Sequence, residues 1–439
     1  MGRVICRIGA GAGFAGDRVD PAVALAASGQ VDVVALECLA ERTLLPALKA
    51  RAVDPAAGFD PRLRRRLTPL LPAANQAGCR VVSNFGQANP RAAGQAIAKL
   101  AAELGLKGLR VAAVLGDDVM PLAAHIAWDR DPAGSVLVGA HAYLGSPAIS
   151  QALAEGADVV VTGRVADSAL FAAPALRHLQ PGDAALAGAV TIGHLLECSG
   201  QLSGGNFEPI GGALLSAEGY ASLGFPLAEV HDDGTAEIRL LDGAPGILTP
   251  ETCTLQLLYE VHDPSRYLTP DLALDFSAIR FEQVGPNRVR VSGARSHGTP
   301  KTLKVVGYIE RPGFIADVEI GFAGTRAYER AQRAAEALRL RLSDWCDEDI
   351  AIDLVGVDSV LRAGSLSMRA PPSELRVHVS ARCANAEAAQ IVEDEVYALT
   401  LSGPAGGCSV RSEKRTRIEV VDGYIAADMI ETSIEWSTS

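Results

Sequence analysis

The sequence lacks the apolar segments that membrane insertion or secretion would need. No apolar run approaches the roughly 20 residues of a membrane-spanning helix. Glycines, and not an apolar core, follow residues 1–7, so we expect no signal peptide. Position 6 is Cys6, where an N-myristoylation motif has serine or threonine. These absences favour a cytoplasmic protein with no membrane partner.

Closely spaced cysteines are also missing. The sequence has no CxxC pair and no Cys/His cluster, which argues against a structural zinc site. EF-hand and HExxH spacings are absent too, so we predict no metal site. Scattered cysteines are typical of reduced thiols in a cytoplasmic protein. They are Cys6, Cys38, Cys79, Cys198, Cys253, Cys346, Cys383 and Cys408.

Basic residues are in the minority, with 40 Lys and Arg against 52 Asp and Glu and a formal net charge of -12. Because nucleic-acid binding depends on neutralising phosphates, we expect no nucleic-acid partner. The apolar content of 48% is normal for a soluble globular protein. A chain of 439 residues is long for a single core, so two domains are expected.

The first part of the sequence alternates regularly between strands and helices. Most predicted strands are continuous apolar runs, which are typical of strands covered by helices on both faces. We therefore predict an α/β, Rossmann-like domain over residues 1–205, with a doubly wound, mainly parallel sheet. A TIM barrel is the alternative, although only six units are recognisable. The predicted strands are 4–8, 31–36, 80–83, 109–115, 135–139 and 158–161, and the helices are 21–27, 61–77, 90–104 and 147–155.

The pattern changes after a glycine cluster near residue 205. Shorter, alternating strands are then combined with two helices, which predicts a second, α+β domain over residues 206–439. The strands are expected at 236–241, 288–291, 302–309, 374–379 and 416–421, and the helices at 326–343 and 385–400.

A glycine-rich loop follows the first predicted strand. Gly11, Gly13 and Gly16 spell GxGxxG, and Glu37 follows about 20 residues later, where a Rossmann domain has its ribose-binding acid. This leaves an NAD(P)-dependent oxidoreductase as one alternative. In the true fingerprint, however, the last glycine lies within the first helical turn. Here residues 17–19 intervene before the helix, so we interpret the loop as one that approaches a small anionic substrate.

Loops that follow the strands of a parallel sheet open at the same edge, so their polar side chains are expected to converge. Such side chains supply amide donors, guanidinium groups and carboxylates for binding a carboxylate or an oxyanion. The alternative for Asn89 is a helix cap before Pro90. The substrate-binding residues expected at this edge are Gly13, Asp17, Arg18, Asn84, Asn89 and Arg164.

Two carboxylates near the end of the second strand are candidates for acid and base roles. If their segment is helical, Glu37 and Glu41 share a face, and neighbouring carboxyl groups have separated pKa values. The alternative is a helix-capping acid together with a surface pair between Glu41 and Arg42. Asp167 is a further acid, at the end of the sixth predicted strand.

Helical spacing puts His194 and Glu197 on one face, with Cys198 beside them. Cys198 is either a nucleophile whose thiolate the imidazole stabilises or a buried structural cysteine. On a later polar turn, His297 and Lys301 could bind a carboxylate or the phosphates of coenzyme A. A solvated turn explains these two residues equally well.

Several motifs together resemble the AtuA-like acyclic terpene utilisation family, in the right order along nearly the whole chain. They lie at residues 13–18, 36–42, 84–89, 163–167, 193–198 and 403–407. The resemblance implies bacterial degradation of acyclic terpenoids such as citronellol and geraniol, whose branched intermediates travel as coenzyme A thioesters. No settled reaction comes with the family. Longer relatives look as if they carry an additional C-terminal domain of about 100 residues, which a separate small subunit would supply here.

Together, the residues and the resemblance predict a homo-oligomeric catabolic enzyme with lyase or hydratase chemistry. Its small-molecule substrate would be a branched carboxylic acid or acyl-CoA, with coenzyme A present only as part of the substrate. Besides the oxidoreductase, a non-catalytic scaffold for a small partner protein is an alternative. The proposed base is Glu37 or Glu41, the acid is Asp167 or His194, and the electrostatic stabilisers are Asn84 and Arg164.

Overall fold

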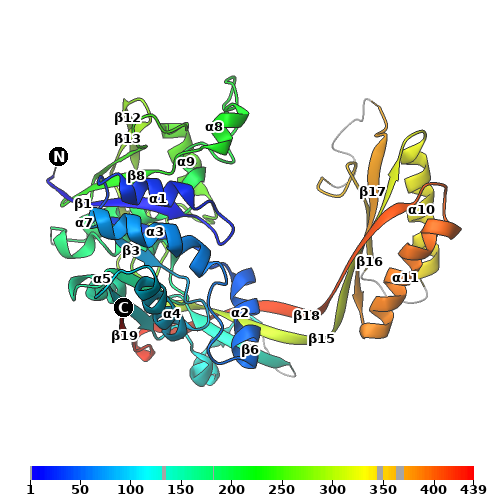
Figure 1. The fold of residues 1–439 in the computed structure, drawn as a ribbon, viewed down its shortest axis with the longest axis horizontal. Coiled ribbons are helices and arrows are strands. Elements are labelled where there is room, and N and C mark those ends of the chain that lie inside the picture. The colour runs from blue at the N-terminus through cyan, green and yellow to red at the C-terminus, as the bar shows by residue number, and fades with distance from the viewer. Residues whose placement is uncertain (1, 131–134, 181, 344–349, 362–369) are drawn as a thin grey trace. The chain divides into compact units, whose positions relative to one another are not determined.

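The computed structural model describes residues 2–130, 135–180, 182–343, 350–361 and 370–439. The chain forms two compact units (Figure 1). The first contains residues 1–131, 139–307 and 421–439, and the second contains residues 132–138 and 308–420. The predicted boundary after residue 205 lies inside the first unit, because the chain returns to the sheet of that unit after residue 206.

A ten-stranded sheet forms the centre of the first unit. In spatial order its strands are β12 (Arg280–Gly285), β13 (Arg288–Ser292), β9 (Ala236–Arg239), β8 (Leu227–His231), β1 (Val4–Ala12), β2 (Val33–Leu36), β3 (Arg80–Ser83), β7 (Val159–Thr162), β4 (Arg110–Leu115) and β19 (Ser433–Thr438). The central neighbours β1, β2, β3, β7 and β4 pair in parallel. Antiparallel strands extend both sides of this core.

Helices cover both faces of the parallel core, which confirms the predicted α/β class. Helices α1 (Asp20–Ala27), α3 (Leu63–Ala77) and α4 (Pro90–Glu103) form one hydrophobic cluster with Val34 and Val81. The alternate strand residues Ala35 and Val82 are equally buried, although they face the other way. Contacts with the strands also come from α5 (Pro147–Ala154), α6 (Asp167–Ala172) and α7 (Asp183–Leu196).

The strand order reverses next to β3. The chain runs through β1, β2, β3 and β4, and then returns by way of α5 to β7, which lies between β3 and β4. In open α/β sheets, ligands bind beyond the carboxyl ends of the strands at such a reversal. The residues that follow β2, β3 and β7 are therefore the main candidates for a ligand-binding site.

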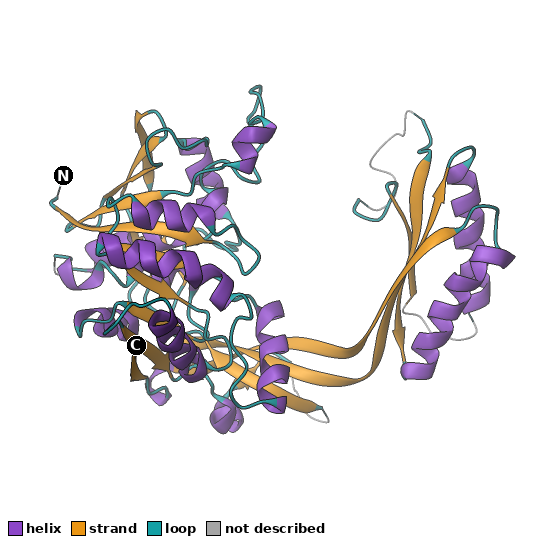
Figure 2. Ribbon diagram, viewed as in Figure 1, coloured by secondary structure: helices purple, strands orange, loops and turns teal. Residues whose placement is uncertain are grey.

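The second unit is an α+β structure, as predicted. Two long strands, β15 (Thr302–Ala323) and β18 (Cys408–Ala426), continue into it from the first unit. Together with β16 (Ile350–Val355) and β17 (Glu374–Cys383) they follow the order β16-β17-β15-β18, which is the order of a split β-α-β arrangement. Helices α10 (Ala327–Leu342) and α11 (Ala386–Ser402) pack with these strands in one hydrophobic cluster (Figure 2).

The remaining elements are short or peripheral. They are α2 (Glu41–Val53), α8 (Ala217–Ala221), α9 (Pro250–Leu258), β5 (Ala127–Trp128), β6 (Val136–Ala142), β10 (Tyr267–Leu268), β11 (Ala273–Asp275), β14 (Arg295–Ser296) and the 3-10 helices Met120–His125, Leu176–His178, Ser199–Gln201 and Ala427–Met429. Within the described residues, none of the helices combines the length and apolar character that crossing a membrane requires.

Candidate functional site

The carboxyl ends of β2, β3 and β7 bring three of the predicted site residues together. Glu37 Oε1 accepts hydrogen bonds from Asn84 Nδ2 (3.0 Å) and from the backbone N–H of Leu39 (2.7 Å). Asn84 Oδ1 in turn accepts one from the backbone N–H of Cys38 (2.6 Å). Glu37, Asn84 and Arg164 are all buried. The expected convergence of strand-end loops is therefore present for these residues.

Arg164 is held on several sides within this cluster. Its guanidinium donates to the carbonyl oxygen of Leu39, donates from Nε (3.0 Å) and Nη2 (2.6 Å) to the carbonyl oxygen of Val165, and pairs with Asp167. The ring of Tyr143 lies 4.5 Å from its central carbon. Although burial lowers the pKa of Arg164, Asp167 and other neighbouring acids raise it above its usual value. Arg164 is therefore a fixed positive charge inside the site.

Glu41, in the first turn of α2, is also influenced by the positive charge of Arg164. The Tyr143 hydroxyl donates a hydrogen bond to Glu41, and Lys304 Nζ lies 5.4 Å from the ring of Tyr143. Burial raises the pKa of Glu41, but this hydrogen bond and the cations Arg164 and Lys304 outweigh burial and lower the net pKa. Because α2 begins only at Glu41, residues 37–40 are not helical, and the helical face that Glu37 was expected to share with Glu41 does not exist.

The pKa values of the other two carboxyl groups in the cluster, those of Glu37 and Asp167, are raised. Burial raises the pKa of Glu37, although Arg164 and two hydrogen bonds oppose the shift. Burial also raises the pKa of Asp167 well above its ordinary range, and the negative charges of Glu37 and Glu197 add to this increase. Carboxyl groups whose pKa values are pushed apart are suited to separate acid and base roles.

A buried Asp117–His141 pair lies behind Arg164 and was not among the predicted site residues. Asp117 Oδ2 accepts hydrogen bonds from the backbone N–H of Arg164 (2.8 Å) and from His141 Nδ1 (2.9 Å). His141 Nε2 is buried and has no hydrogen-bond partner among the described residues. Asp117 lies two residues after the end of β4, and this position just past a strand end was the signal in the sequence that could have identified it.

His194 faces Glu197, as the helical spacing predicted. Its Nδ1 lies 2.9 Å from Glu197 Oε1, and its Nε2 lies 3.1 Å from the carbonyl oxygen of Leu257. Burial lowers the pKa of His194, but these two acceptors outweigh burial, so the net pKa is raised. Burial and Glu197 raise the pKa of Cys198, which keeps its thiol protonated. These contacts favour the structural alternative for Cys198 over the nucleophile.

The raised pKa of His194 predicts a pH-dependent stability. A histidine whose pKa is raised in the folded state stabilises the fold fully below its ordinary pKa of 6.5, and this stabilisation is lost as the pH rises through the raised value. The free energy of unfolding should therefore fall as the pH rises above about 6.5 and through the raised pKa of His194, as measured by urea unfolding. His194→Gln should flatten the curve, whereas the exposed control His125→Gln should not. Parallel curves for all three proteins would contradict the assignment.

Backbone groups of the glycine-rich loop form hydrogen bonds with the side chains of Asp17 and Arg66. The carboxylate of Asp17 accepts from the backbone N–H groups of Gly13 (2.9 Å) and Arg18 (2.8 Å). The buried guanidinium of Arg66 donates to the carbonyl oxygens of Ala15 and Asp17, both at 2.8 Å. A phosphate cradle needs free backbone N–H groups, which Asp17 withdraws here. The arrangement therefore does not favour the dinucleotide alternative.

The loop does not direct the predicted side chains toward the cluster. Arg18 donates to the carbonyl oxygen of Leu223 (3.0 Å) and pairs with Asp20. A Cβ atom on Gly13 would lie 2.6 Å from the backbone of Cys198, so this glycine is required where the loop packs closely on the end of α7. Gly13 and Asp17 therefore have structural roles that the sequence did not reveal.

Three further predicted substrate-binding residues lie outside the cluster. Asn89 caps the N-terminus of α4, and its Nδ2 donates to the carbonyl oxygens of Pro55 and Ala57, which favours the capping alternative. His297 is exposed, with Nε2 3.1 Å from a backbone carbonyl oxygen, and Lys301 is exposed directly before β15. In the described part of the chain, no hydrogen bond or ion pair joins these three residues to Glu37 or Arg164.

The cysteines are scattered through the described residues as free thiols. Seven cysteines are free thiols, and Cys346 lies outside the described residues. Among the residues that the structure describes, no group of three or more His, Cys, Asp or Glu side chains is arranged to hold a metal ion.

Comparison with known protein families finds a match that covers nearly the whole chain. Residues 6–436 match the family described as acyclic terpene utilisation family protein AtuA. No curated protein and no solved structure matches the chain.

Proposed function

The chain belongs to the acyclic terpene utilisation family AtuA, and we propose that it is an enzyme with lyase or hydratase activity. Its substrate would be a branched carboxylic acid, or the corresponding coenzyme A thioester, from the degradation of an acyclic terpene. The observation that carries this proposal is the set of carboxyl groups around the buried Arg164, of which Glu37 and Asp167 have raised pKa values and Glu41 has a lowered one.

Addition or elimination of water beside a carbonyl group needs a base, an acid and a stabiliser for the enolate-like oxygen. Glu41 is the base in this proposal, because its lowered pKa keeps it ionised at neutral pH. Asp167 is the acid, because burial raises its pKa and so favours its protonated form. Arg164 supplies the fixed positive charge between them. Asn84 acts by orienting Glu37, since its amide is hydrogen-bonded to that carboxyl group.

Exposed apolar side chains near the cluster suit a branched hydrocarbon substrate. Phe14 is 48% exposed, and its carbonyl oxygen lies 3.8 Å from Cys38 Sγ, next to Glu37. Leu258 and Tyr259 are 46% and 40% exposed at the end of α9, next to Leu257, whose carbonyl oxygen lies 3.1 Å from His194 Nε2. Burial of such side chains against a branched chain would contribute roughly 25 cal/mol per Å² of apolar area.

Turnover assays with the Glu41→Gln variant test this function. The full-length protein should be incubated with a panel of branched free acids and their coenzyme A thioesters, with loss or gain of water followed by mass spectrometry. We expect activity toward one class and a loss of about a hundredfold or more in kcat for Glu41→Gln, because the amide cannot accept the proton. The exposed control Glu336→Gln should retain full activity. Undiminished turnover by Glu41→Gln would remove Glu41 as the base, and no turnover with any compound would contradict the reaction class.

A further inference from the structure

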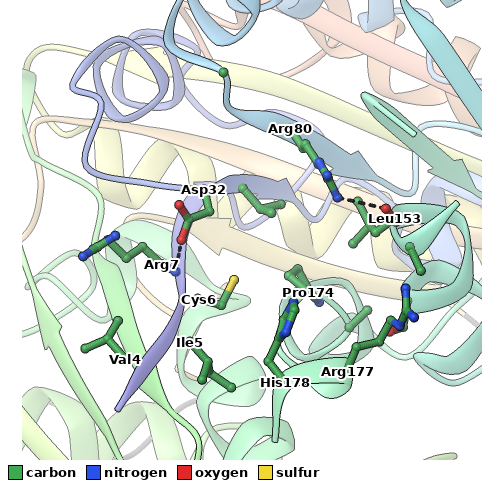
Figure 3. A pocket seen from close by; sticks show the side chains of 15 residues that line it. Val4, Ile5, Cys6, Arg7, Asp32, Arg80, Leu153, Pro174, Arg177 and His178 are labelled. Carbon is green, nitrogen blue, oxygen red and sulfur yellow. Dashed lines mark hydrogen bonds between the residues drawn. The ribbon is translucent and has the colours of Figure 1, made fainter. Parts of the chain in front are cut away.

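A cavity of about 610 Å³ opens at the opposite edge of the sheet, where the parallel strands begin (Figure 3). Cys6 and Arg7 at the start of β1, Asp32 before β2 and Arg80 at the start of β3 line it. This volume lies within the range of small-molecule sites. β2 and β3 have 4 residues each, which separates this edge from the Glu41 and Asp167 edge by about 10–13 Å. A ligand in the cavity would therefore occupy a second, separate site.

The lining of the cavity is positively charged, although the chain as a whole carries a net charge of -12. Arg80 and Arg177 contribute two guanidinium groups and His178 lies beside Arg177, whereas the side chain of Arg7 points to the other side of β1 from Cys6 (Figure 3). Asp32 is the single carboxylate among the described residues that line the cavity. Arg80 and Arg177 together carry two positive charges, which suits the binding of a dianion.

These cations have few partners of their own. Arg80 donates from Nη1 to the carbonyl oxygen of Leu153 (2.9 Å), which holds it across the cavity (Figure 3). In the described part of the chain, the side chains of Arg7 and Arg177 form no hydrogen bond or ion pair. Asp32 Oδ2 is engaged by the backbone N–H of Arg7 (2.7 Å). Guanidinium groups without acids are well suited to bind phosphate oxygens in a bidentate manner.

The walls between these charges are apolar. Ile5, Leu153 and Pro174 line the cavity together with the side chain of Cys6. Burial and the neighbouring Asp32 raise the pKa of Cys6 to about 12, so its thiol is neutral and adds no negative charge. The cavity thus combines a cationic part with an apolar surface, and a ligand that fits both must be amphipathic.

We propose that this cavity is a binding site for an organic phosphate, a doubly charged phosphate ester with an apolar body. The phosphate lies between the guanidinium groups of Arg80 and Arg177, and the apolar body contacts Leu153 and Pro174. This site is independent of the proposed chemistry at the carboxyl edge.

Titration calorimetry of the full-length protein with phenyl phosphate tests the site. Inorganic phosphate and phenylacetate are the comparison probes, which separate the contributions of the dianion and the apolar ring. We expect phenyl phosphate to bind at least tenfold more tightly than either. Arg177→Gln should weaken binding about tenfold, whereas Asp32→Asn should strengthen it, because it removes a negative charge from the described lining of the cavity. Arg65→Gln, an exposed arginine on α3 outside the cavity, is the matched control and should bind as the unaltered protein does.

Three results would overturn the proposal. One is the absence of measurable phenyl phosphate binding. Another is unchanged affinity in both Arg177→Gln and Arg80→Gln, each shown by its thermal unfolding curve to be folded. Tighter binding of phenylacetate than of phenyl phosphate would assign the cavity to carboxylates. Because the probes bind without being turned over, this experiment tests the phosphate site independently of the proposed enzymatic activity.

Discussion

Asp167→Asn is expected to lower kcat about a thousandfold, within the range of a lost general acid. Asparagine has nearly the same shape as aspartic acid but cannot act as a general acid. The carboxyl group is accessible, since its side chain is 37% exposed although its partner Arg164 is 2% exposed. Steady-state kinetics with the substrate identified in the screen measure this loss. The exposed control Asp183→Asn should leave kcat unchanged.

The pH profile distinguishes a lost acid from a distorted site. Activity of the unaltered protein should fall as the pH rises through the pKa of Asp167, because the acid then loses its proton. Activity should also fall at low pH as Glu41, whose pKa lies below its ordinary 4.5, becomes protonated. Asp167→Asn should lose the alkaline limb and keep the acid limb. A variant with the full two-limbed profile and a kcat within threefold of normal would show that Asp167 is not the acid.

The convergence of Glu37, Asn84 and Arg164 could be predicted from the sequence because it depends only on local patterns. Each follows an apolar strand, and the carboxyl ends of parallel strands necessarily share an edge. Lys304 could not be assigned in this way. Lys304 lies on β15, about 140 residues after the last predicted strand of the first domain, and only the folded chain places it beside Tyr143.

The pairing of the antiparallel strands in the ten-stranded sheet could not be predicted from local sequence patterns either. The parallel core was predicted because helices separate its strands in a regular manner. The edge strand β19, however, pairs with β4 more than 300 residues earlier in the sequence, and no local pattern specifies such a partner. The predicted strands 302–309 and 416–421 are also only parts of β15 and β18, which have 22 and 19 residues.

The glycine-rich loop was misjudged for a related reason. Its glycines and its acid were interpreted as features that face a substrate. The group that organises the loop is Arg66, a buried side chain on α3 about 50 residues away, whose guanidinium donates to carbonyl oxygens of residues 14–18. A buried arginine within a helix gives no signal in the sequence that separates it from the exposed arginines Arg64 and Arg65 beside it.

Arg164→Met should have the largest effect on stability, about 2–5 kcal/mol in the free energy of unfolding. Methionine fills much of the volume but leaves the carbonyl oxygens of Leu39 and Val165 without their donor in a buried environment, and each such loss costs about 1–3 kcal/mol. Urea unfolding measures the difference, with Arg65→Met on the surface of α3 as the matched control.

The same variant also tests how Arg164 acts on the neighbouring acid. Arg164 lowers the pKa of Asp167 against the effect of burial. Without this charge the pKa of Asp167 must rise further, so the alkaline limb of the activity profile should move to higher pH in the fraction of Arg164→Met that remains folded. If Arg164→Met were as stable as Arg65→Met, water would replace the guanidinium as the hydrogen-bond donor to the carbonyl oxygens of Leu39 and Val165. An unmoved alkaline limb would mean that Asp167 is not the group that titrates, which would separate the structural role of Arg164 from the proposed chemistry.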